Sequence, residues 1–381
     1  MKKTTLFLLF CCLSIPTLYG QKSPSPIRTA VPFLSISPDA TSAAMADAGV
    51  ATHPDVYSQF HNPAKYAFAN AQSSISISYT PWLQNITGDM FLGYLAYFHH
   101  LKKNGTLATS LRVFSLGAVE MTDYISGQVI PLGTYNPMEM VLDVSYSMRL
   151  SSRLSMGFAL RYTRSDISER SDPSTDDFHA GNAISADFSL YYTSREYRLE
   201  RLKISYSWGI NIRDIGSKID YGSSSLTAYD YLPTTLSLGG GIHLHHKEKN
   251  IFSIYIETAK LLVPTPVWNE EKEAYITPDE GILSSMWDAL TYAPGGFGEK
   301  ISEYTLQCAL QWEYDKRYAI RAGWYYSDPI KGGIQSFTMG GSATYKRINI
   351  SMAYAIPLYS QSPTSSSIRI SIANELGREK K

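Results

Sequence analysis

The fold is decided by the stretch MEMVLDVSYSMRLSSRLSMGFALRYTR, residues 138–164, in which apolar and polar side chains alternate over two consecutive segments. In the first segment every second residue is apolar, and only Val141 breaks the pattern. After the short SSR link the alternation resumes and continues to Tyr162. A period of two predicts β-strands with one apolar and one polar face. Alternation alone fits both a soluble sandwich and a transmembrane barrel, because each needs two-faced strands.

Segments of this kind recur from Ser73 to the C-terminal region. We count about fourteen, which is an even number as expected of a bacterial outer-membrane barrel. They lie near residues 73–80, 90–100, 106–118, 137–150, 153–165, 182–193, 201–213, 234–245, 251–261, 302–314, 317–326, 335–345, 348–356 and 366–374.

The links between these segments alternate in length. After even-numbered segments they are mostly short and charged, as in SSR, HHKEKN, YDKR and KR. After odd-numbered segments they are longer, and one runs from Leu262 to Ile301. A soluble sandwich gives no reason for this sorting, whereas an outer-membrane barrel has tight periplasmic turns and long outer loops. We therefore predict an all-β fold, a transmembrane antiparallel barrel of about 14 strands over residues 73–381.

Composition agrees with a membrane barrel. Aromatic residues make up 13% of the chain, and charged residues make up 18%, below the usual quarter. Beyond the first twenty residues no run of eighteen apolar residues could span a membrane as a helix. The balance of 34 basic and 34 acidic residues gives no support for a nucleic-acid partner. We expect a multi-pass barrel in the outer membrane with both termini in the periplasm.

The first 72 residues lack the alternation and divide into three parts. Residues 1–20 carry two lysines and an apolar run too short to span, which predicts a signal peptide cleaved after Gly20. Residues 21–32 contain three prolines and predict a flexible periplasmic arm. Residues 33–72 are rich in small residues and predict a plug, or hatch, inside the barrel.

Within the predicted plug, the segment TSAAMADAGVA fits a short helix. Asp39 and Thr41 are both suitable caps, and Gly49 is a suitable end. Signal-peptide cleavage would leave Cys308 as the single cysteine, so we expect no internal disulfide.

The plug region resembles a known family. The residues that carry the resemblance are AVPFLSISPDATSAAMADAGVA (30–51), the run FHNPAKYAF with Asn62, Pro63 and Ala64, and SISYTPWL (76–83). Together they resemble the plug and NPA motif of FadL-type outer-membrane barrels, which have fourteen strands. Within that group the chain is most similar to the PorV (LptO) family of the type IX secretion system of Bacteroidota. One departure is the C-terminus IANELGREKK, where barrels commonly end on an aromatic residue.

The resemblance implies a carrier with no chemistry of its own. PorV-like proteins bind the C-terminal domain of secreted cargo as it leaves the translocon barrel (SprA/Sov). They then bring the cargo to a surface attachment complex that contains PorU. Their surroundings are outer-membrane lipid, and they need no cofactor.

Two other functions stay open from the sequence. A FadL-like transporter of hydrophobic small molecules would need an apolar pocket beneath the outer loops and a kinked strand near the plug. A lipid A deacylase acting on lipopolysaccharide would need Ser, His and an acid that converge.

Candidate catalytic and metal-binding residues are few. His243 and His245 share the polar face of one strand, yet no third ligand with metal spacing is near them. His99 and His100 lie at another turn, and the acidic run 172–177 lacks the spacing and glycine of a calcium loop. We therefore predict no catalytic residue, no cofactor and no metal.

The long link from 262 to 301 is the candidate partner-docking loop. It contains Trp268 and the helix-like stretch GILSSMWDALTY, in which Ile282, Met286 and Leu290 lie on one face and Trp287 is adjacent. An apolar face on an outer loop is costly unless something covers it. Either a partner covers this face, or the loop folds down over the barrel mouth as a lid.

The predicted sidedness can be tested with single cysteines in a Cys308→Ser background. Lys247→Cys lies in a short link and should react with a membrane-impermeant maleimide only after the outer membrane is permeabilised. Glu271→Cys lies in a long link and should react on intact cells, because long loops face outward. Labelling at 247 without labelling at 271 would reverse the orientation.

Overall fold

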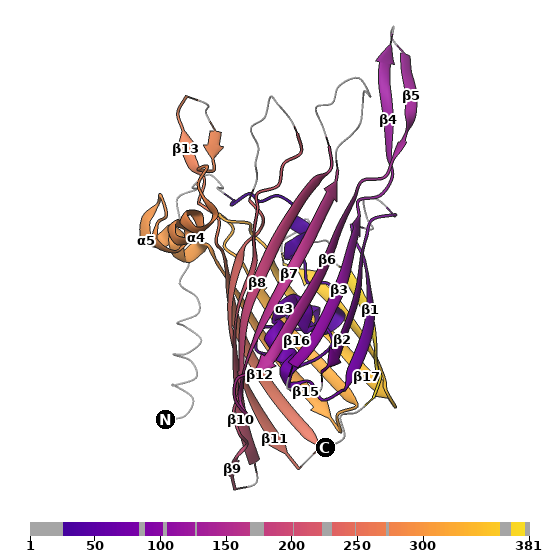
Figure 1. The fold of residues 1–381 in the computed structure, drawn as a ribbon, viewed down its shortest axis with the longest axis vertical. Helices are drawn as coiled ribbons and strands as arrows, with labels where there is room; N and C mark the ends of the chain where they lie inside the picture. The colour runs from indigo at the N-terminus through magenta and orange to yellow at the C-terminus, as the bar shows by residue number, and fades with distance from the viewer. Residues whose placement is uncertain are drawn as a thin grey trace.

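The structure, a computed structural model, describes residues 26–83, 88–101, 105–125, 128–167, 179–200, 202–222, 231–247, 249–271, 274–358 and 367–377. The predicted signal peptide and the acidic run 172–177 lie outside this part of the chain. Fourteen antiparallel strands among the described residues form one closed barrel, in which β1 pairs with β19 and β10 with β11 (Figure 1).

The barrel strands follow the chain order around the wall. They are β1 (Ser73–Pro81), β2 (Phe91–His100), β3 (Gly105–Ser115), β6 (Met138–Arg149), β7 (Leu154–Asp166), β8 (Gly181–Thr193), β10 (Leu202–Gly216), β11 (Thr235–His246), β12 (Asn250–Leu261), β15 (Tyr304–Tyr314), β16 (Tyr318–Tyr326), β17 (Gln335–Tyr345), β18 (Ile348–Pro357) and β19 (Ser367–Glu375). Each begins and ends within three residues of a predicted segment. The prediction of about fourteen strands is confirmed.

Short turns gather at one end of the barrel and long loops at the other (Figure 1). The long-loop end carries two small hairpins, β4 (Val119–Ile125) with β5 (Gln128–Tyr135), and β13 (Val267–Asn269) with β14 (Ala274–Ile276). At the short-turn end β9 (Tyr197–Leu199) pairs with the first residues of β10. The two ends are called the short-turn end and the long-loop end below.

The two faces of the wall have the predicted chemistry. On β7, Leu160 is 68% exposed on the outside, whereas its neighbour Ala159 is 2% exposed and faces the lumen. The lumen side also holds buried charges, including Asp143 and Arg161. The apolar side chains therefore face lipid, and the polar side chains face the interior. No helix among the described residues has the length and apolar content needed to cross a membrane.

The plug occupies the lumen as four short helical pieces (Figure 1). They are η1 (Pro32–Ser35), α2 (Ala40–Ala43), α3 (Ser58–His61) and η2 (Pro63–Phe68). The element η2 packs against β6, β7 and β8, while α2 packs against β17, β18 and β19. The plug thus contacts opposite parts of the wall.

The helix expected over TSAAMADAGVA is shorter than predicted. Asp39 caps it, since its side chain accepts a hydrogen bond from the Ser42 N–H, but α2 ends at Ala43 rather than at Gly49. Ala46 and Asp47 have φ angles of 57° and 62°, which no helix allows. Wall side chains satisfy the backbone groups beyond this point, so a longer helix is not needed.

Residues 26–32, expected in a periplasmic arm, lie at the long-loop end instead. The Ala30 N–H donates to the Tyr231 carbonyl at 2.9 Å, and Val31 packs in a buried apolar cluster with Ile219. Both partners belong to the link between β10 and β11. The described part of this segment is therefore packed against the long links, and its periplasmic location stays a prediction. Apolar burial under the outer loops stabilises residues that a solvated arm would leave in water.

The lipid face can be tested by introducing a charge. Leu160→Arg should lower the free energy of unfolding by about 2–4 kcal/mol, because the side chain would meet hydrocarbon near mid-strand. Leu160→Met and Ala159→Ser should stay within about 1 kcal/mol, since one keeps an apolar surface and the other adds a hydroxyl to a polar lumen. Urea unfolding in lipid vesicles measures the difference, and equal costs for Leu160→Arg and Ala159→Ser would contradict the assignment of faces.

Candidate functional site

The NPA motif is the point where the plug is fastened to the wall. The Asn62 side-chain amide donates to the carbonyl of Val50 at 2.9 Å and to the carbonyl of Leu190, on β8, also at 2.9 Å. Its carbonyl oxygen accepts from the Ala64 N–H at 3.1 Å. Asn62 is fully buried, so these bonds satisfy a polar group that has no access to water. One side chain therefore joins two parts of the plug to the barrel.

Pro63 and Ala64 bring the backbone of η2 against strands β7 and β8. Pro63 begins η2, where its missing N–H costs nothing. The Ala64 N–H also donates to Ser189, and its carbonyl accepts from Ser155 at 2.7 Å. A Cβ at Gly157 would lie 2.6 Å from the Ala64 nitrogen, so only glycine allows this approach. Small and hydroxyl-bearing wall residues thus form the seat of the motif.

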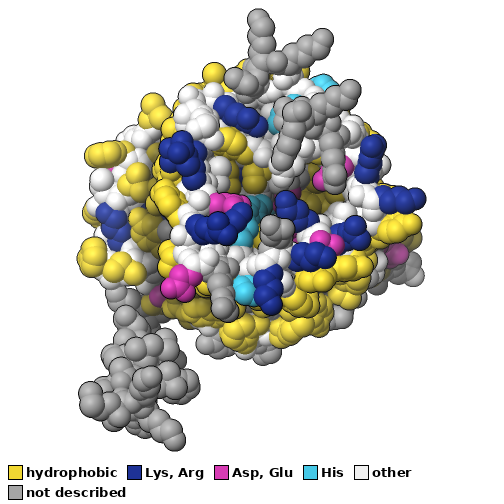
Figure 2. All heavy atoms as spheres, turned by 90° about the horizontal axis from the view of Figure 1, so that it is seen from below, with side chains coloured by type: hydrophobic (Ala, Val, Ile, Leu, Met, Phe, Trp, Pro, Cys, Tyr) yellow, Lys and Arg dark blue, Asp and Glu magenta, His cyan; other side chains and the backbone are white. Residues whose placement is uncertain are grey.

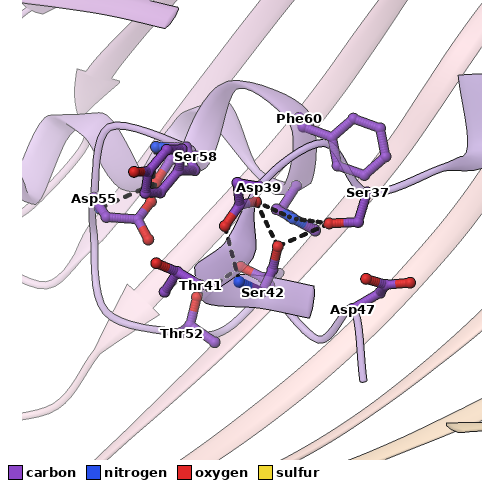
Figure 3. A network of polar contacts seen from close by, with 12 residues as sticks. Ser37, Asp39, Thr41, Ser42, Asp47, Thr52, Asp55, Ser58 and Phe60 are labelled. Carbon is purple, nitrogen blue, oxygen red and sulfur yellow. Dashed lines mark hydrogen bonds and ion pairs between the residues drawn. The ribbon is translucent and has the colours of Figure 1, made fainter. Parts of the chain in front are cut away.

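A buried polar network links α2 to the residue before the motif (Figure 3). His61 Nε2 lies 3.4 Å from Asp39 and 3.4 Å from Ser37, and Asp39 also accepts from Ser42. This is a Ser, His and Asp set, yet both His61 contacts use the same ring nitrogen. A catalytic triad needs the serine on one nitrogen and the acid on the other. The network holds α2 against α3 and offers no route for nucleophile activation.

Two charged side chains of the plug, Asp39 and Lys65, are buried and make hydrogen bonds to neighbouring plug residues. Burial by itself raises the pKa of the Asp39 carboxyl, but hydrogen bonds from His61 and Ser42 outweigh it and leave the pKa below its ordinary value. Burial lowers the pKa of the Lys65 ammonium, which donates to the Gly49 carbonyl and to Thr52, each at 2.8 Å. These contacts tie η2 to the turn after α2.

Arg161 is the centre of a buried ion cluster in the lumen. It pairs with Asp143 at 3.1 Å, with Asp187 at 2.8 Å, and with Asp214. All four side chains are at most 2% exposed. They come from β6, β7, β8 and β10, so the cluster crosslinks four neighbouring strands from the inside. Sequence reasoning did not single it out, although charges at lumen positions in mid-strand were the available signal.

Phe60 of the plug inserts between two further arginines. The guanidinium of Arg213 lies 4.3 Å from the ring centroid and that of Arg112 lies 5.1 Å from it. Arg112 also donates to the Leu34 carbonyl at 3.3 Å. Cation–π contacts of this kind are worth more when they are shielded from water. The ion cluster and the plug are therefore parts of one packed unit.

Above this unit, the long-loop half of the lumen is apolar and filled. Phe33 stacks on Phe114 of β3 with ring centroids 5.6 Å apart. The buried cluster consists of Ala30, Val31, Phe33, Leu34, Leu92, Phe114, Val141, Ala183, Ile219 and Leu232. It joins the start of the plug to strands and outer links.

The histidines that we considered as metal ligands have other roles. His243 lies in the lumen, 3.0 Å from the hydroxyls of both Ser207 and Ser253, and its ring packs on His53. His99 is on the outer face of β2, whereas His100 points inward. Within the described residues no group of three or more His, Cys, Asp or Glu side chains is placed to hold a metal ion.

The candidate docking loop forms a platform beside the long-loop rim (Figure 1). It contains α4 (Ile282–Thr291) and α5 (Gly296–Ser302). On α4, Trp287 is 67% exposed and Leu283 is 77% exposed, while Ser285 and Ala289 are buried. The lid alternative is wrong for the described residues, because the helices lie beside the mouth rather than over it (Figure 1).

The predicted docking residues divide into two groups. Trp268, 51% exposed, and Trp287 are exposed, whereas Ile282, Met286 and Leu290 are each half-buried. Sequence reasoning missed four other exposed apolar side chains of this loop, which are Leu283, Tyr292, Phe297 and Ile301. Helical spacing identifies residues that share a face, but it does not say whether that face packs on the barrel or points away from it.

Ion pairs anchor this platform to the barrel at both ends. Lys218, in the link after β10, pairs with Asp279, and the Tyr231 hydroxyl of the same link accepts from the Glu280 N–H at 2.8 Å. On the other side Glu303 pairs with Lys260 of β12 at 2.7 Å. Two-sided anchoring gives the exposed residues a fixed position on the rim.

Comparison with protein-family models decides the family. Residues 20–268 match the model described as type IX secretion system protein PorV, which is well over half of the 381 residues. The chain belongs to the PorV family. The matched range contains the NPA motif, the ion cluster and the barrel strands from β1 to β12. The family is thus one described by its part in type IX secretion. No curated protein sequence gives a significant match.

Solved structures similar to this PorV-family chain include two described as toluene transporters and one described as a FadL homologue. The toluene transporter TodX of Pseudomonas putida is 13% identical, with 90% of this chain and 99% of that chain covered and a TM-score of 0.49. The toluene transporter TbuX of Ralstonia pickettii is 12% identical, with 90% and 98% covered and a TM-score of 0.47. A FadL homologue of Pseudomonas aeruginosa is 12% identical, with 93% and 100% covered and a TM-score of 0.43. At these scores the likenesses carry no argument, and the fold assignment rests on the closed sheet itself.

The role of the NPA asparagine in fastening the plug can be measured directly. Asn62→Ala removes the side-chain donor to the carbonyls of Val50 and Leu190, which should cost about 1–3 kcal/mol. Backbone amides of α3 and η2 should then exchange hydrogen faster. Asn70→Ala is the matched control, because Asn70 is exposed and should leave exchange unchanged. Unchanged exchange in Asn62→Ala would show that the wall holds the plug without this side chain.

Proposed function

We propose that this PorV-family barrel is a carrier in type IX secretion. In this proposal it binds the C-terminal domain of secreted cargo as the cargo leaves the translocon barrel (SprA/Sov). It then brings the cargo to the PorU attachment complex. The proposal takes the docking surface to be the platform of α4 and α5, centred on Leu283 and Trp287.

The observation that carries the proposal is an exposed apolar surface held in a fixed position. Leu283, Trp287 and Phe297 are each more than 60% exposed, although ion pairs anchor the loop that bears them. An apolar face with this much exposed surface is costly in water unless a partner covers it. Aromatic and aliphatic anchors of this type supply most of the energy of protein interfaces. A rigid apolar platform therefore suits docking of a folded protein domain.

The transporter alternative receives less support from the lumen. A hydrophobic ligand would need an apolar cavity under the outer loops, yet the cluster around Phe33 and Phe114 fills that region with side chains. The pairing of β10 with β8 does shift register between Ile212 and Ile215, which resembles the kinked strand of a transporter. Asp214 at this shift is fully buried and pairs with Arg161, so the bulge faces charge rather than an apolar pocket.

Among the described residues the deacylase alternative also lacks a suitable site. The Ser37, His61 and Asp39 set is buried in the plug, where no lipid can approach it. The lumen pair of His243 and Ser207 has a second serine at the other ring nitrogen instead of an acid. Neither arrangement can activate a serine by the usual route.

The carrier proposal can be tested with Leu283→Ser combined with Trp287→Ser. Both side chains are exposed, so the barrel should remain folded and heat-modifiable on gels. If each is an anchor worth about 2 kcal/mol, cargo binding should weaken roughly 30-fold for each residue. Co-purification of cargo C-terminal domains in mild detergent measures this, and secreted cargo should remain unattached at the surface.

A second loop provides the matched comparison. Tyr124→Ser with Val129→Ser removes two equally exposed residues, 72% and 66%, from the β4–β5 hairpin. Cargo binding should survive this change. Full cargo retention by the platform variant, or loss only in the hairpin variant, would refute the platform as the docking surface.

A further inference from the structure

A large cavity opens at the short-turn end, opposite the proposed docking platform. Its volume is about 1550 Å³, and it is lined by the plug residues from Thr52 to Tyr57 and by residues of the surrounding turns. Figure 2 views this end of the barrel and shows Lys and Arg side chains gathered around its opening. The plug closes the cavity from above, so a guest can enter only from the short-turn end.

The lining of this cavity carries an excess of positive charge. Eight Lys or Arg residues and five Asp or Glu residues line it. Of the eight, only Lys203 lies within ion-pair distance of a carboxylate among the described residues, 2.8 Å from Glu196. In mid-lumen, by contrast, Arg161 faces three aspartates directly. The other seven basic groups of the cavity can therefore meet an anion from outside.

Arg321 is the most informative of these groups. It is 8% exposed, and its hydrogen bonds go to the neutral side chains of Gln311, at 2.8 Å, and Ser342, at 3.0 Å. Among the described residues no carboxylate forms a direct ion pair with Arg321, and Glu313, which also lines the cavity, acts on it only from a longer distance. A buried charge without a directly paired counter-ion is costly. An anionic group that enters the cavity would supply that counter-ion.

Arg149 presents a second ordered cation to the same cavity. Its Nε donates to the Ala67 carbonyl at 2.6 Å, and its guanidinium lies 5.2 Å from the centroid of the Phe68 ring. Both contacts hold the group in place without neutralising it. Two pre-positioned guanidinium groups on different parts of the wall favour carboxylates, which arginine binds in a fork geometry.

The size of the cavity indicates the class of guest. Pockets for small molecules usually enclose about 300–1,000 Å³, which is well below this volume. The hairpin of β9 with β10 adds exposed charged and apolar residues at one side of the opening, including Tyr197 and Lys203. A cavity of this size and charge suits several residues of an extended chain.

We propose that the cavity at the short-turn end binds an acidic, extended segment of a periplasmic protein. Carboxylates of the segment would pair with Arg149 and Arg321 inside, and the basic turns would contact it at the opening. This goes beyond the carrier function, because it places a second partner at the end away from the docking platform.

Peptide binding to the purified full-length chain tests the proposal. The probe is a fluorescent ten-residue peptide of alternating Glu and Ser, and the uncharged control is the same peptide with Gln in place of Glu. Fluorescence anisotropy should detect binding of the Glu peptide only, and raised salt should weaken it. Arg321→Gln should weaken binding about tenfold or more, since the charge it loses is buried. Arg321→Lys should keep most of the affinity.

The controls separate the proposed site from general electrostatics. Arg164→Gln removes an exposed arginine at the long-loop end of β7, with a side chain 46% exposed, and should leave peptide affinity unchanged. Heat-modifiability on gels confirms that each variant is folded. Equal binding of Glu and Gln peptides, or equal losses in Arg321→Gln and Arg164→Gln, would overturn the proposal. Binding of short-chain phosphatidylglycerol in place of the peptide would also overturn it, by assigning the cavity to lipid headgroups.

Discussion

The structure depends on how the backbone N–H and C=O groups of the irregular plug find hydrogen-bond partners inside a closed barrel. Strands that face lipid must pair with one another, so the wall has few backbone groups left for the plug, and the Leu190 carbonyl that accepts from Asn62 is one of them. The plug is not regular enough to satisfy its own N–H and C=O groups. Wall side chains therefore supply the missing partners, as when Glu257 accepts from the N–H groups of Gly49 and Val50 at 2.8 and 2.9 Å. The polar face of the strands is a set of hydrogen-bond partners for the plug rather than the lining of a water channel.

The same requirement explains the charges in mid-lumen. Arg161 can be buried only because three aspartates surround it, and those aspartates come from strands that closure brings together. Phe60 adds the plug to this arrangement through Arg112 and Arg213. Removal of one partner would leave another charge unpaired, so the plug and the wall are stabilised jointly.

The two ends of the barrel differ in kind. At the long-loop end the lumen is filled by apolar side chains, and exposed apolar residues lie beside the rim on α4 and α5. At the short-turn end the lumen is open, and of its eight basic lining residues only Lys203 has an ion-pair partner among the described residues. An apolar rim suits a folded protein surface, whereas a basic cavity suits an acidic chain segment. This division follows from where the plug lies, since it packs tightly against one half of the lumen and leaves the other open.

Local sequence pattern by itself predicted the barrel. The period of two identified the strands and the face that meets lipid, and the alternation of short and long links distinguished the two ends of the barrel. Asp39 as a helix cap was also readable, because capping depends on neighbours three residues away. The path of residues 26–32, the end of α2 and the outward turn of Leu283 were not readable. Each depends on partners more than 190 residues apart or on which side of a helix meets the rim, as with Ala30 and Tyr231 or Ala46 and Thr338. Only closure of the barrel brings such partners together, and sequence spacing carries no record of that distance.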